Sequence, residues 1–252
     1  MLKDFYEKHK NFSFRTLSEY YLSPGIRCKF DKLKGYVGTK RYFTSGIDLG
    51  SSGNSFLLFL DNIKQKSFLD LASFPLNQYK YKKAQHPICA DLVNLPYRDE
   101  SFDFISALDV LEHIKEDNLA IAEISRILTK NGIAVITVPH RMKYYSMQDK
   151  IIGHVRRYEI NQIISYFERF NLIDLKIFGI YGQLMLIADI QSANPKKIEE
   201  NLITLRDKYE SNMIFRSVWN IVVKILSRLM KIDAKYCPQK RLRNIGLIFT
   251  KK

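Results

Sequence analysis

Residues 46–54 read GIDLGSSGN and lead directly into the apolar run SFLL at residues 55–58. The opening residues have the composition of a buried strand, and Gly50 and Gly53 suit a tight turn from that strand into a predicted helix. Such a turn lets the backbone approach a ligand closely, and a helix N-terminus favours negative charge. Alone the signal is weak, because glycines also serve turns without ligands and the dinucleotide pattern GxGxxG is absent.

Short apolar runs alternate with helical stretches further along the chain. Strands are predicted at residues 46–49, 67–71, 87–90, 102–108, 132–139 and 246–250. A helix is predicted over residues 118–129, with Asp117 as its N-cap and Asn131-Gly132 as a left-handed C-terminal stop. Strands separated by helices favour parallel βαβ units. We therefore predict an α/β, Rossmann-like fold with a doubly wound, mostly parallel sheet.

The 252 residues suffice for one large α/β domain with appendages. Residues 46–195 are the predicted core, and residues 241–252 supply the terminal strand of its sheet. Residues 1–45 are rich in Tyr and Phe, and we expect a helical lid over a pocket there, with ordinary packing as the alternative. Residues 196–240 form a predicted basic helical insert before the last strand.

Aspartates end three of the predicted strands. Asp48 closes the first strand, Asp70 the second and Asp91 the third. Parallel strands bring such side chains to one edge of the sheet, where α/β folds bind ligands. A carboxylate such as that of Asp70 can accept hydrogen bonds from both hydroxyls of a ribose. The three aspartates and the glycine turn together predict a nucleoside site.

Residues 91–105 (DLVNLPYRDESFDFI), 109–114 (DVLEHI) and 123–132 (EISRILTKNG) carry a further signal. With Val138-Pro139 they resemble the class I S-adenosylmethionine (SAM) dependent methyltransferases of the ubiquinone/menaquinone-biosynthesis-like, type 11 group. The resemblance covers about residues 44–180. It implies a class I methyltransferase fold and an enzyme that transfers a methyl group from SAM.

The resemblance also implies contacts between the strand ends and SAM. In order they are Asp48, Gly50, Ser52 and Gly53 at the methionine end, Asp70 and Leu71 at the ribose, Asp91 and Leu92 at the adenine, and Ala107, Leu108 and Asp109 below the sulfonium. One departure is that Ser52 and Asn54 stand where the family commonly has glycine, so a slightly reshaped loop is expected.

Candidate catalytic groups follow the fourth strand. Asp109, Glu112, His113 and Glu116 have the spacing of one helix face, next to the predicted sulfonium position. His113 is a candidate general base, with Asp109 and His154 as further catalytic candidates. One alternative is that Glu112 and His113 only pin the helix through hydrogen bonds. Another is a divalent ion on this face, but we assign no metal site from the sequence.

A second group follows the strand that ends at Pro139. His140 and the run GHVRRY at residues 153–158 lie where the resemblance places the acceptor side. We predict acceptor contacts from His140, Arg156, Arg157 and Tyr158, because guanidinium groups bind phosphate or carboxylate bidentately. The alternative is a solvated loop with Arg–Asp pairing.

Charge is unevenly distributed along the chain. Lys/Arg minus Asp/Glu gives +6 for residues 1–45, −1 for residues 46–195 and +9 for residues 196–252. The basic flanks are candidates for contact with phosphate, nucleic acid or an anionic membrane, with solubility alone as the alternative. Residues 213–232 predict a helix with a wide apolar face, a cationic stripe and a Trp, typical of a membrane interface. Packing against its own domain or a dimer contact are the alternatives.

These observations favour methyl transfer to an O or N of a small-molecule, lipid or lipid-linked sugar acceptor. An RNA methyltransferase and a non-catalytic SAM-binding or interaction protein remain as alternatives. The three cysteines lack metal-ligand spacing, and residues 1–10 lack the apolar segment of a signal peptide. We expect a cytoplasmic protein, with peripheral attachment to the inner face of a membrane as an option.

Overall fold

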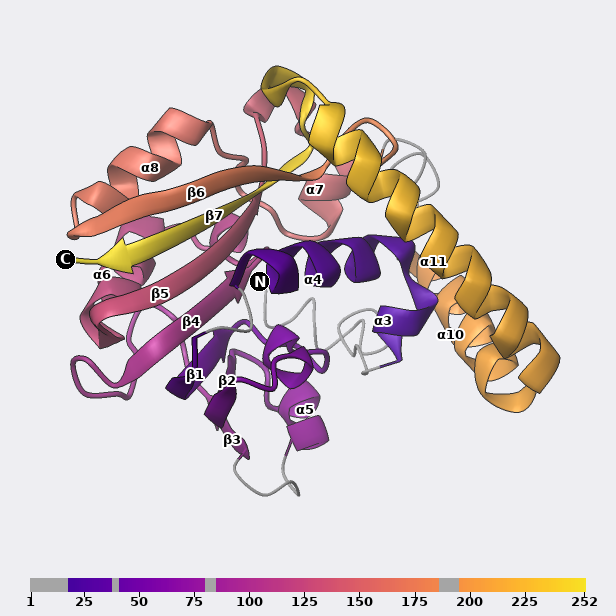
Figure 1. Cartoon of the computed structure of the whole chain (residues 1–252), viewed down its shortest axis with the longest axis horizontal. Helices are drawn as coiled ribbons and strands as arrows, with labels where there is room; N and C mark the ends of the chain where they lie inside the picture. The colour runs from indigo at the N-terminus through magenta and orange to yellow at the C-terminus, as the bar shows by residue number, and fades with distance from the viewer. Residues whose placement is uncertain (1–17, 38–40, 80–84, 186–194) are drawn as a thin grey trace.

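The computed structural model describes residues 18–37, 41–79, 85–185 and 195–252. In them a seven-stranded sheet has the order β3-β2-β1-β4-β5-β7-β6 (Figure 1). The strands are β1 (Phe43–Leu49), β2 (Ile63–Asp70), β3 (Gln85–Cys89), β4 (Phe102–Leu108), β5 (Leu128–Pro139), β6 (Leu172–Tyr181) and β7 (Asn244–Lys251). Strand β7 is antiparallel to β5 and β6, whereas the other neighbours pair in parallel. The predicted α/β, mostly parallel fold is confirmed.

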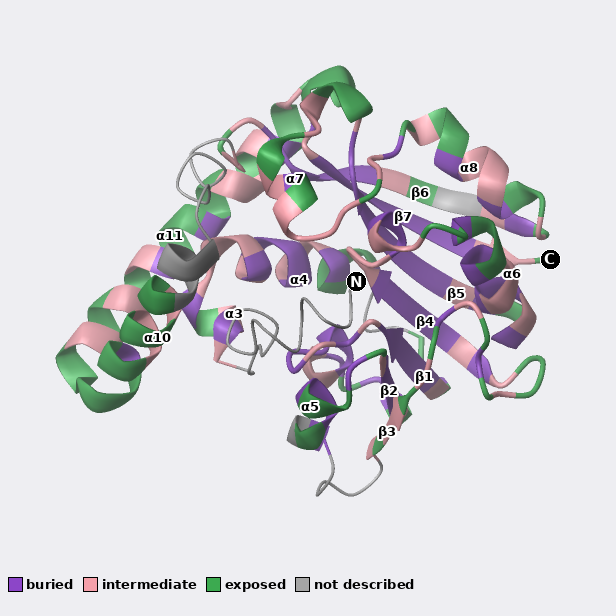
Figure 2. Ribbon diagram, turned by 180° about the vertical axis from the view of Figure 1, so that it is seen from behind, coloured by how far each residue is buried: buried purple, intermediate pink, exposed green. Residues whose placement is uncertain are grey.

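Helices cover both faces of the sheet (Figures 1 and 2). The α-helices are α3 (Glu19–Leu22), α4 (Pro24–Val37), α5 (Ser73–Leu76), α6 (Asp117–Ile127), α7 (Met147–Ile151), α8 (Ile160–Glu168), α10 (Pro195–Ser211) and α11 (Met213–Tyr236). Helices α6 and α8 pack on one face, and α4 packs on the other together with Met230 of α11. The chain is therefore a three-layer structure.

The central strands are apolar on both sides because both faces are covered. In β5, Ala134 and Ile136 join the core beneath α6 and α8, whereas Val135 between them joins the core beneath α4. In β7, Leu247 joins the core beneath α6 and α8, and Ile248 joins the core beneath α4. This period of two explains why near-continuous apolar runs mark these strands in the sequence.

The predicted late strand is present as β7, which lies between β5 and β6 and completes the sheet. Strand β6 was not predicted. Its sequence, LIDLKIFGIY, includes Asp174 and Lys176, and a register shift relative to β7 lies between these two residues. A charged, bulged strand lacks the uninterrupted apolar pattern used to predict the others.

Two predicted helical features are wrong. The glycine turn leads into η1 (Phe56–Phe59), a single 3-10 turn, since Ser55 caps Leu57 and the chain enters β2 at Ile63. Residues 109–116 do not form one helix face, because the left-handed backbone of Asp109 (φ 54°) turns the chain into the short 3-10 helix η3 (Leu111–His113).

The caps predicted for helix α6 are also wrong. Its N-cap is Glu116, and Asp117 is the first helical residue. At the other end the helix stops at Ile127. Asn131 does have a left-handed backbone (φ 59°), but it lies inside β5 and not at the end of the helix. The chain enters β5 directly, and the β4–β5 register shifts between Phe102 and Phe104, opposite this turn.

Core packing predicts a large effect of Ile136→Ala. Ile136 is fully buried between β4 and β7, so truncation removes apolar contacts and leaves a cavity. We expect urea denaturation to show a free energy of unfolding lower by about 2–4 kcal/mol. The matched variant Ile203→Ala, on the exposed side of α10, should change it by less than about 1 kcal/mol. Equal losses would contradict this assignment of the core.

Candidate functional site

A cavity of about 540 Å³ lies at the carboxyl ends of the parallel strands. The strand order reverses here, since β1 pairs with β2 on one side and β4 on the other. Such a reversal separates the connections that leave neighbouring strands and opens a crevice. Its wall contains all the predicted SAM contacts except Gly53 and Ala107, namely Asp48, Gly50, Ser52, Asp70, Leu71, Asp91, Leu92, Leu108 and Asp109. Ala107 is fully buried within β4.

The glycine turn is held in a left-handed conformation. Gly50 has φ of +71°, and a Cβ added there would lie 2.6 Å from Cγ2 of Val110. Ser52, where the family commonly has glycine, also has positive φ, at 49°. Its N–H donates to Asp70 at 2.9 Å. The serine therefore adopts a glycine-like backbone, and the absence of a Cβ at Gly50 lets the turn pack closely against Val110.

Asp48 is the buried carboxylate beneath this turn. Ser55 Oγ donates to it at 2.5 Å, and Ser106 Oγ donates to its other oxygen. Burial raises the pKa of Asp48 to about 6, although both hydroxyls act against this rise. The group ties β1, β4 and the turn together.

Asp70 and Asp91 lie further along the same edge. Asp70 accepts from the backbone N–H groups of Ser52 and Ala72, each at 2.9 Å, and burial raises its pKa. Asp91 is exposed at the rim, where it accepts from Val93 N at 3.2 Å. Each oxygen of a carboxylate accepts more than one hydrogen bond, so both groups retain capacity for ligand hydroxyl or amino groups.

Asn54 is a site residue whose role the sequence did not reveal. Its side chain is buried and borders the cavity, and its Oδ1 accepts no hydrogen bond from the described residues. An orphaned buried acceptor is costly unless a ligand or water satisfies it. The carbonyl oxygen therefore suits the ammonium of an amino-acid moiety, whereas the sequence marked Asn54 only as a departure from glycine.

The opposite wall begins with Asp109. Lys29 of α4 donates to its carboxylate at 2.6 Å, and Thr137 and Asn244 donate at 2.8 Å each. Burial favours a higher pKa, but the Lys29 ammonium and these hydrogen bonds hold the pKa of Asp109 below its usual range. The ionised group joins the N-terminal helix to β5 and β7. No sequence signal pointed to Lys29, which lies 80 positions away.

Glu112, His113 and His154 meet beside it. Atoms from the three side chains lie within 4.8 Å of one another, and both Glu112 oxygens are buried without a hydrogen-bond partner from other described residues. Asp149 lies 2.7 Å from Nδ1 of His154 and receives two bonds of 2.9 Å from Arg157. Those bonds help to hold the pKa of Asp149 below its usual range against its burial.

This arrangement sets the protonation of the wall. Because Asp149 is ionised, it favours a proton on Nδ1 of His154. The other ring nitrogen, Nε2, lies 3.7 Å from Oε1 of Glu112. Burial raises the pKa of Glu112 well above its usual value, and the charge of Asp109 adds to the rise. Burial and the neighbouring His154 lower the pKa of His113 to about 4. His113 is thus unprotonated near pH 7, and burial disfavours the charged form of Glu112. They are able to exchange a proton with an acceptor, or with His154 to ligate a divalent cation.

Three of the four predicted acceptor residues do not border the cavity. His140 is buried with Nδ1 3.3 Å from the carbonyl of Leu242. The hydroxyl of the fully buried Tyr158 lies 2.8 Å from Asp117, which also pairs with Arg156 at 2.6 Å. These side chains support the loop, whereas Arg157 borders the cavity and is paired with Asp149.

Helices α3, α4 and α10 form another part of the cavity wall. Ile26, Lys29 and Phe30 of the α3–α4 region border it, and Arg206 of α10 pairs with buried Glu19. Phe30 packs against Phe56 with ring centroids 5.4 Å apart. The aromatic residues of the predicted lid before position 18 lie outside the described residues.

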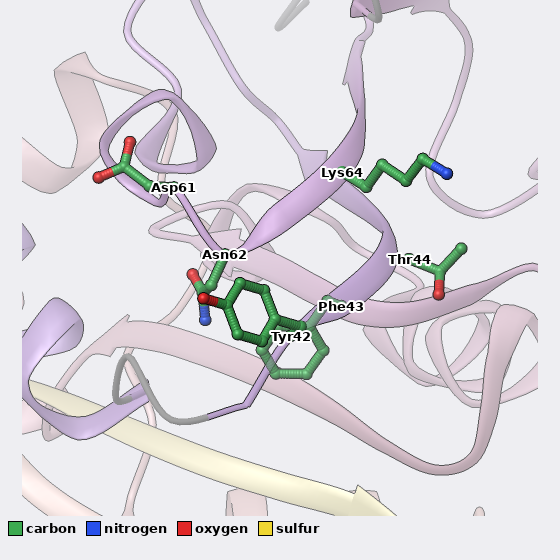
Figure 3. Close-up of a pocket in the computed structure, with 6 residues that line it drawn as sticks. All are labelled: Tyr42, Phe43, Thr44, Asp61, Asn62 and Lys64. Atoms are coloured by element: carbon green, nitrogen blue, oxygen red, sulfur yellow. The ribbon is translucent and has the colours of Figure 1, made fainter.

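A second cavity, of about 270 Å³, lies at the opposite end of β1 and β2 (Figure 3). It is lined by Tyr42, Phe43, Thr44, Asp61, Asn62 and Lys64. Tyr42 is 82% exposed, and Lys64 extends away from it. The strand-end carboxylates and the left-handed turn all belong to the larger cavity, which is therefore the candidate site.

Residues 47–136 match the family model described as a methyltransferase domain. The matched stretch runs from β1 to β5 and contains the turn, Asp48, Asp70 and Asp91. The chain carries a class I methyltransferase domain. The predicted family, a family of enzymes that use SAM, is confirmed, although the ubiquinone- and menaquinone-related subgroup is not singled out.

Two curated relatives resemble parts of this methyltransferase chain. An uncharacterized protein of Methanocaldococcus jannaschii is 26% identical over 144 residues, which are 56% of this chain and 61% of that protein. The tRNA (carboxymethyluridine(34)-5-O)-methyltransferase of Arabidopsis thaliana is 39% identical over 69 residues, which are 26% of this chain and 17% of that protein. The matches therefore span less than two thirds of either relative.

Among solved structures, phosphoethanolamine N-methyltransferase 2 of Haemonchus contortus in complex with S-adenosyl-L-methionine has a TM-score of 0.64. The superposition covers 100% of this chain and 60% of that chain at 17% identity. At this identity the likeness concerns the methyltransferase fold alone.

The backbone of the turn predicts opposite outcomes for two substitutions. Gly50→Ala adds a Cβ against Val110 at a positive φ, so we expect SAM affinity in calorimetry to fall at least about tenfold. Ser52→Gly relieves a left-handed serine, so affinity should stay within about threefold. Equal losses for both variants would show that the turn does not bind the ligand in this conformation.

Asp48 predicts a dependence of stability on pH. Because its folded pKa, about 6, exceeds the usual 3.8, the folded state holds the extra proton between these values. The contribution of Asp48 to stability is therefore present at acidic pH and lost as the pH rises through 6. We expect the free energy of unfolding of the wild type, measured in urea without SAM, to fall between pH 5 and pH 7.5. The fall for Asp48→Asn over the same range should be smaller by roughly 1 kcal/mol. Parallel losses would contradict a raised pKa.

Proposed function

We propose that this protein transfers a methyl group from SAM to an oxygen or nitrogen of a small-molecule or lipid acceptor. The observation that carries the proposal is the convergence of Asp48, Asp70 and Asp91 with the Gly50 turn on one cavity. The residues present fit SAM, because Asn54 offers an unsatisfied buried acceptor and the left-handed Gly50 turn lies on the same cavity wall.

Each part of SAM has a complementary group in the cavity. Asp70 suits the two ribose hydroxyls, and Asp91 at the rim suits the adenine amino group. Asn54 and the turn suit the amino-acid end. When bound, SAM supplies a methyl group on a positively charged sulfur, which is already activated for displacement.

The protein would then contribute alignment, exclusion of water and a proton acceptor. Helices α4 and α10 contribute side chains to the cavity wall, which shield part of a bound ligand from water. His113 is unprotonated near neutral pH, as is required of a base, and a hydroxyl or ammonium acceptor loses one proton on methylation. A pKa near 4 makes His113 a weak base, so an acceptor whose own proton becomes acidic in the reaction fits best.

Arg243 favours an acceptor that carries an anionic group. It borders the cavity, its guanidinium lies 3.9 Å above the ring of Tyr144, and its buried Nε has no hydrogen-bond partner in the described part of the chain. Lys29, Arg157 and Arg206 also border the cavity but are paired with carboxylates. A carboxylate or phosphate near Arg243 would satisfy its guanidinium.

RNA is a second candidate acceptor. The observation in its favour is the 39% identity over 69 residues to a plant tRNA methyltransferase. The basic charge of residues 196–252 is compatible with a polyanion. If RNA is the acceptor, the affinity of the protein for RNA should fall steeply as the salt concentration rises.

The proposal predicts loss of SAM binding in Asp70→Asn. The substitution removes the charge that would accept the ribose hydroxyls, so calorimetric affinity should fall about 10- to 100-fold. The control Asp61→Asn, on an exposed loop next to β2, should bind as the wild type does. Wild-type protein that does not bind SAM would contradict the proposal.

The acceptor class follows from one labelling experiment. Cell extract is incubated with methyl-labelled SAM and the protein, and then separated into lipid, RNA and small-molecule fractions. We expect label in the lipid or small-molecule fraction, absent with Asp70→Asn. Label confined to RNA, and lost after ribonuclease treatment, would establish the second candidate instead. Binding of SAM without transfer in any fraction would favour a non-catalytic SAM-binding protein.

A further inference from the structure

Helix α11 is fastened to the domain by only one side of its surface. Trp219 donates to the Leu22 carbonyl at 3.2 Å, and Val223, Ser227 and Ala234 are buried. Lys231 pairs with Asp31 of α4 at 2.6 Å. Two polar residues, Ser227 and Lys231, therefore face the protein.

The outward side of the same helix is apolar. Exposed fractions are 77% for Ile214, 55% for Val218, 60% for Ile221, 51% for Ile225, 47% for Leu229, 55% for Ile232 and 73% for Tyr236. Their spacing of three and four residues places them in one line along the helix, which we call the outer row. Over 24 residues this line is about 36 Å long. A helix that only completed the core would bury this row.

Cationic side chains run beside the outer row. Lys224, Arg228 and Lys235 are exposed and lie on one flank, at about 20–60° on a wheel where the row lies at about 80–160°. The single acidic residue of α11, Asp233, accepts from Leu184 N at 2.9 Å and so is turned toward the domain. The surface is thus both apolar and positively charged. A contiguous exposed patch of this kind marks an interaction surface.

The positive charge beside the outer row distinguishes between two possible partners of this surface, a second copy of the chain and an anionic membrane. A second copy joined by two-fold symmetry would set this patch against itself, with Lys224 and Arg228 near the same residues of the other copy. Such like charges repel one another. An anionic lipid surface satisfies both features, because it accepts the isoleucines among its acyl chains and attracts the flanking lysine and arginine.

We propose that α11 lies in the plane of an anionic membrane, with its outer row inserted at the interface. No helix in the described ranges is long and apolar enough to cross a bilayer, which agrees with attachment in the plane. Helix α10, which packs against α11, contributes Leu202 and Arg206 to the cavity wall. The attached surface is therefore next to an element that borders the site.

Vesicle flotation tests this proposal without any readout of methyl transfer. The 252-residue chain is mixed at low salt with vesicles of phosphatidylcholine containing about one third phosphatidylglycerol, and with phosphatidylcholine alone. We expect binding to the anionic vesicles at least about tenfold stronger than to neutral ones, and weaker at high salt. Protein that stays in solution at low salt, or binds both vesicles equally, would overturn the proposal.

Variants assign the binding to the outer row. Ile221→Ser/Ile225→Ser should lower binding at least about tenfold, whereas Leu119→Ser, at a 48% exposed position on α6, should not. Lys224→Gln/Arg228→Gln should weaken binding more than Lys64→Gln/Lys130→Gln, which removes the same charge elsewhere. Circular dichroism and SAM calorimetry check that every variant is folded.

Light scattering tests the alternative that the outer row is a contact between two copies of the chain. The protein should be of one mass across concentrations without lipid, and the isoleucine variant should have the same mass. A dimer that the isoleucine substitutions dissociate, together with no vesicle binding, would identify the outer row as a contact between copies and overturn the membrane proposal.

Discussion

The structure depends on the burial of one carboxylate, Asp48, at the point where the strand order reverses. A buried charge is costly, and Ser55 and Ser106 offset part of that cost by donating to it from the turn and from β4. The hydrogen bonds bind three segments at the edge where ligands approach. Asp48 therefore fixes the position of the turn and of β4 at this edge of the cavity.

The remaining walls are joined to that edge by residues distant in sequence. Asp109 receives bonds from Lys29 of α4, Thr137 of β5 and Asn244 of β7. The N-terminal segment and the last strand thus meet at one ionised group. Burial opposes the charged forms of Glu112 and His113, which lie just beyond Asp109, and this contrast between neighbours is typical of functional sites.

Much of the cofactor wall could be predicted from sequence because it is local. Asp48, Asp70 and Asp91 each lie within two residues of the end of a strand, and parallel strands bring their carboxyl ends to one edge. The acceptor wall could not be predicted in the same way. His140, Arg156 and Tyr158 have the chemistry of ligand contacts, yet the loop turns them toward Leu242, Lys115 and Asp117. Residue type does not specify the direction of a side chain on an irregular loop.

The sequence by itself determined the strands of the α/β sheet other than β6, the glycine turn and the amphipathic helix α11, since periodicity and strand-end chemistry are properties of neighbouring residues. Only the tertiary structure decided that Lys29 reaches Asp109, that Asn54 is left as a buried acceptor and that the outer row of α11 faces away from the core. Those outcomes depend on which surfaces pack together over long separations. The periodicity of a segment predicts that it has an apolar face, but it does not predict which surface will pack against that face.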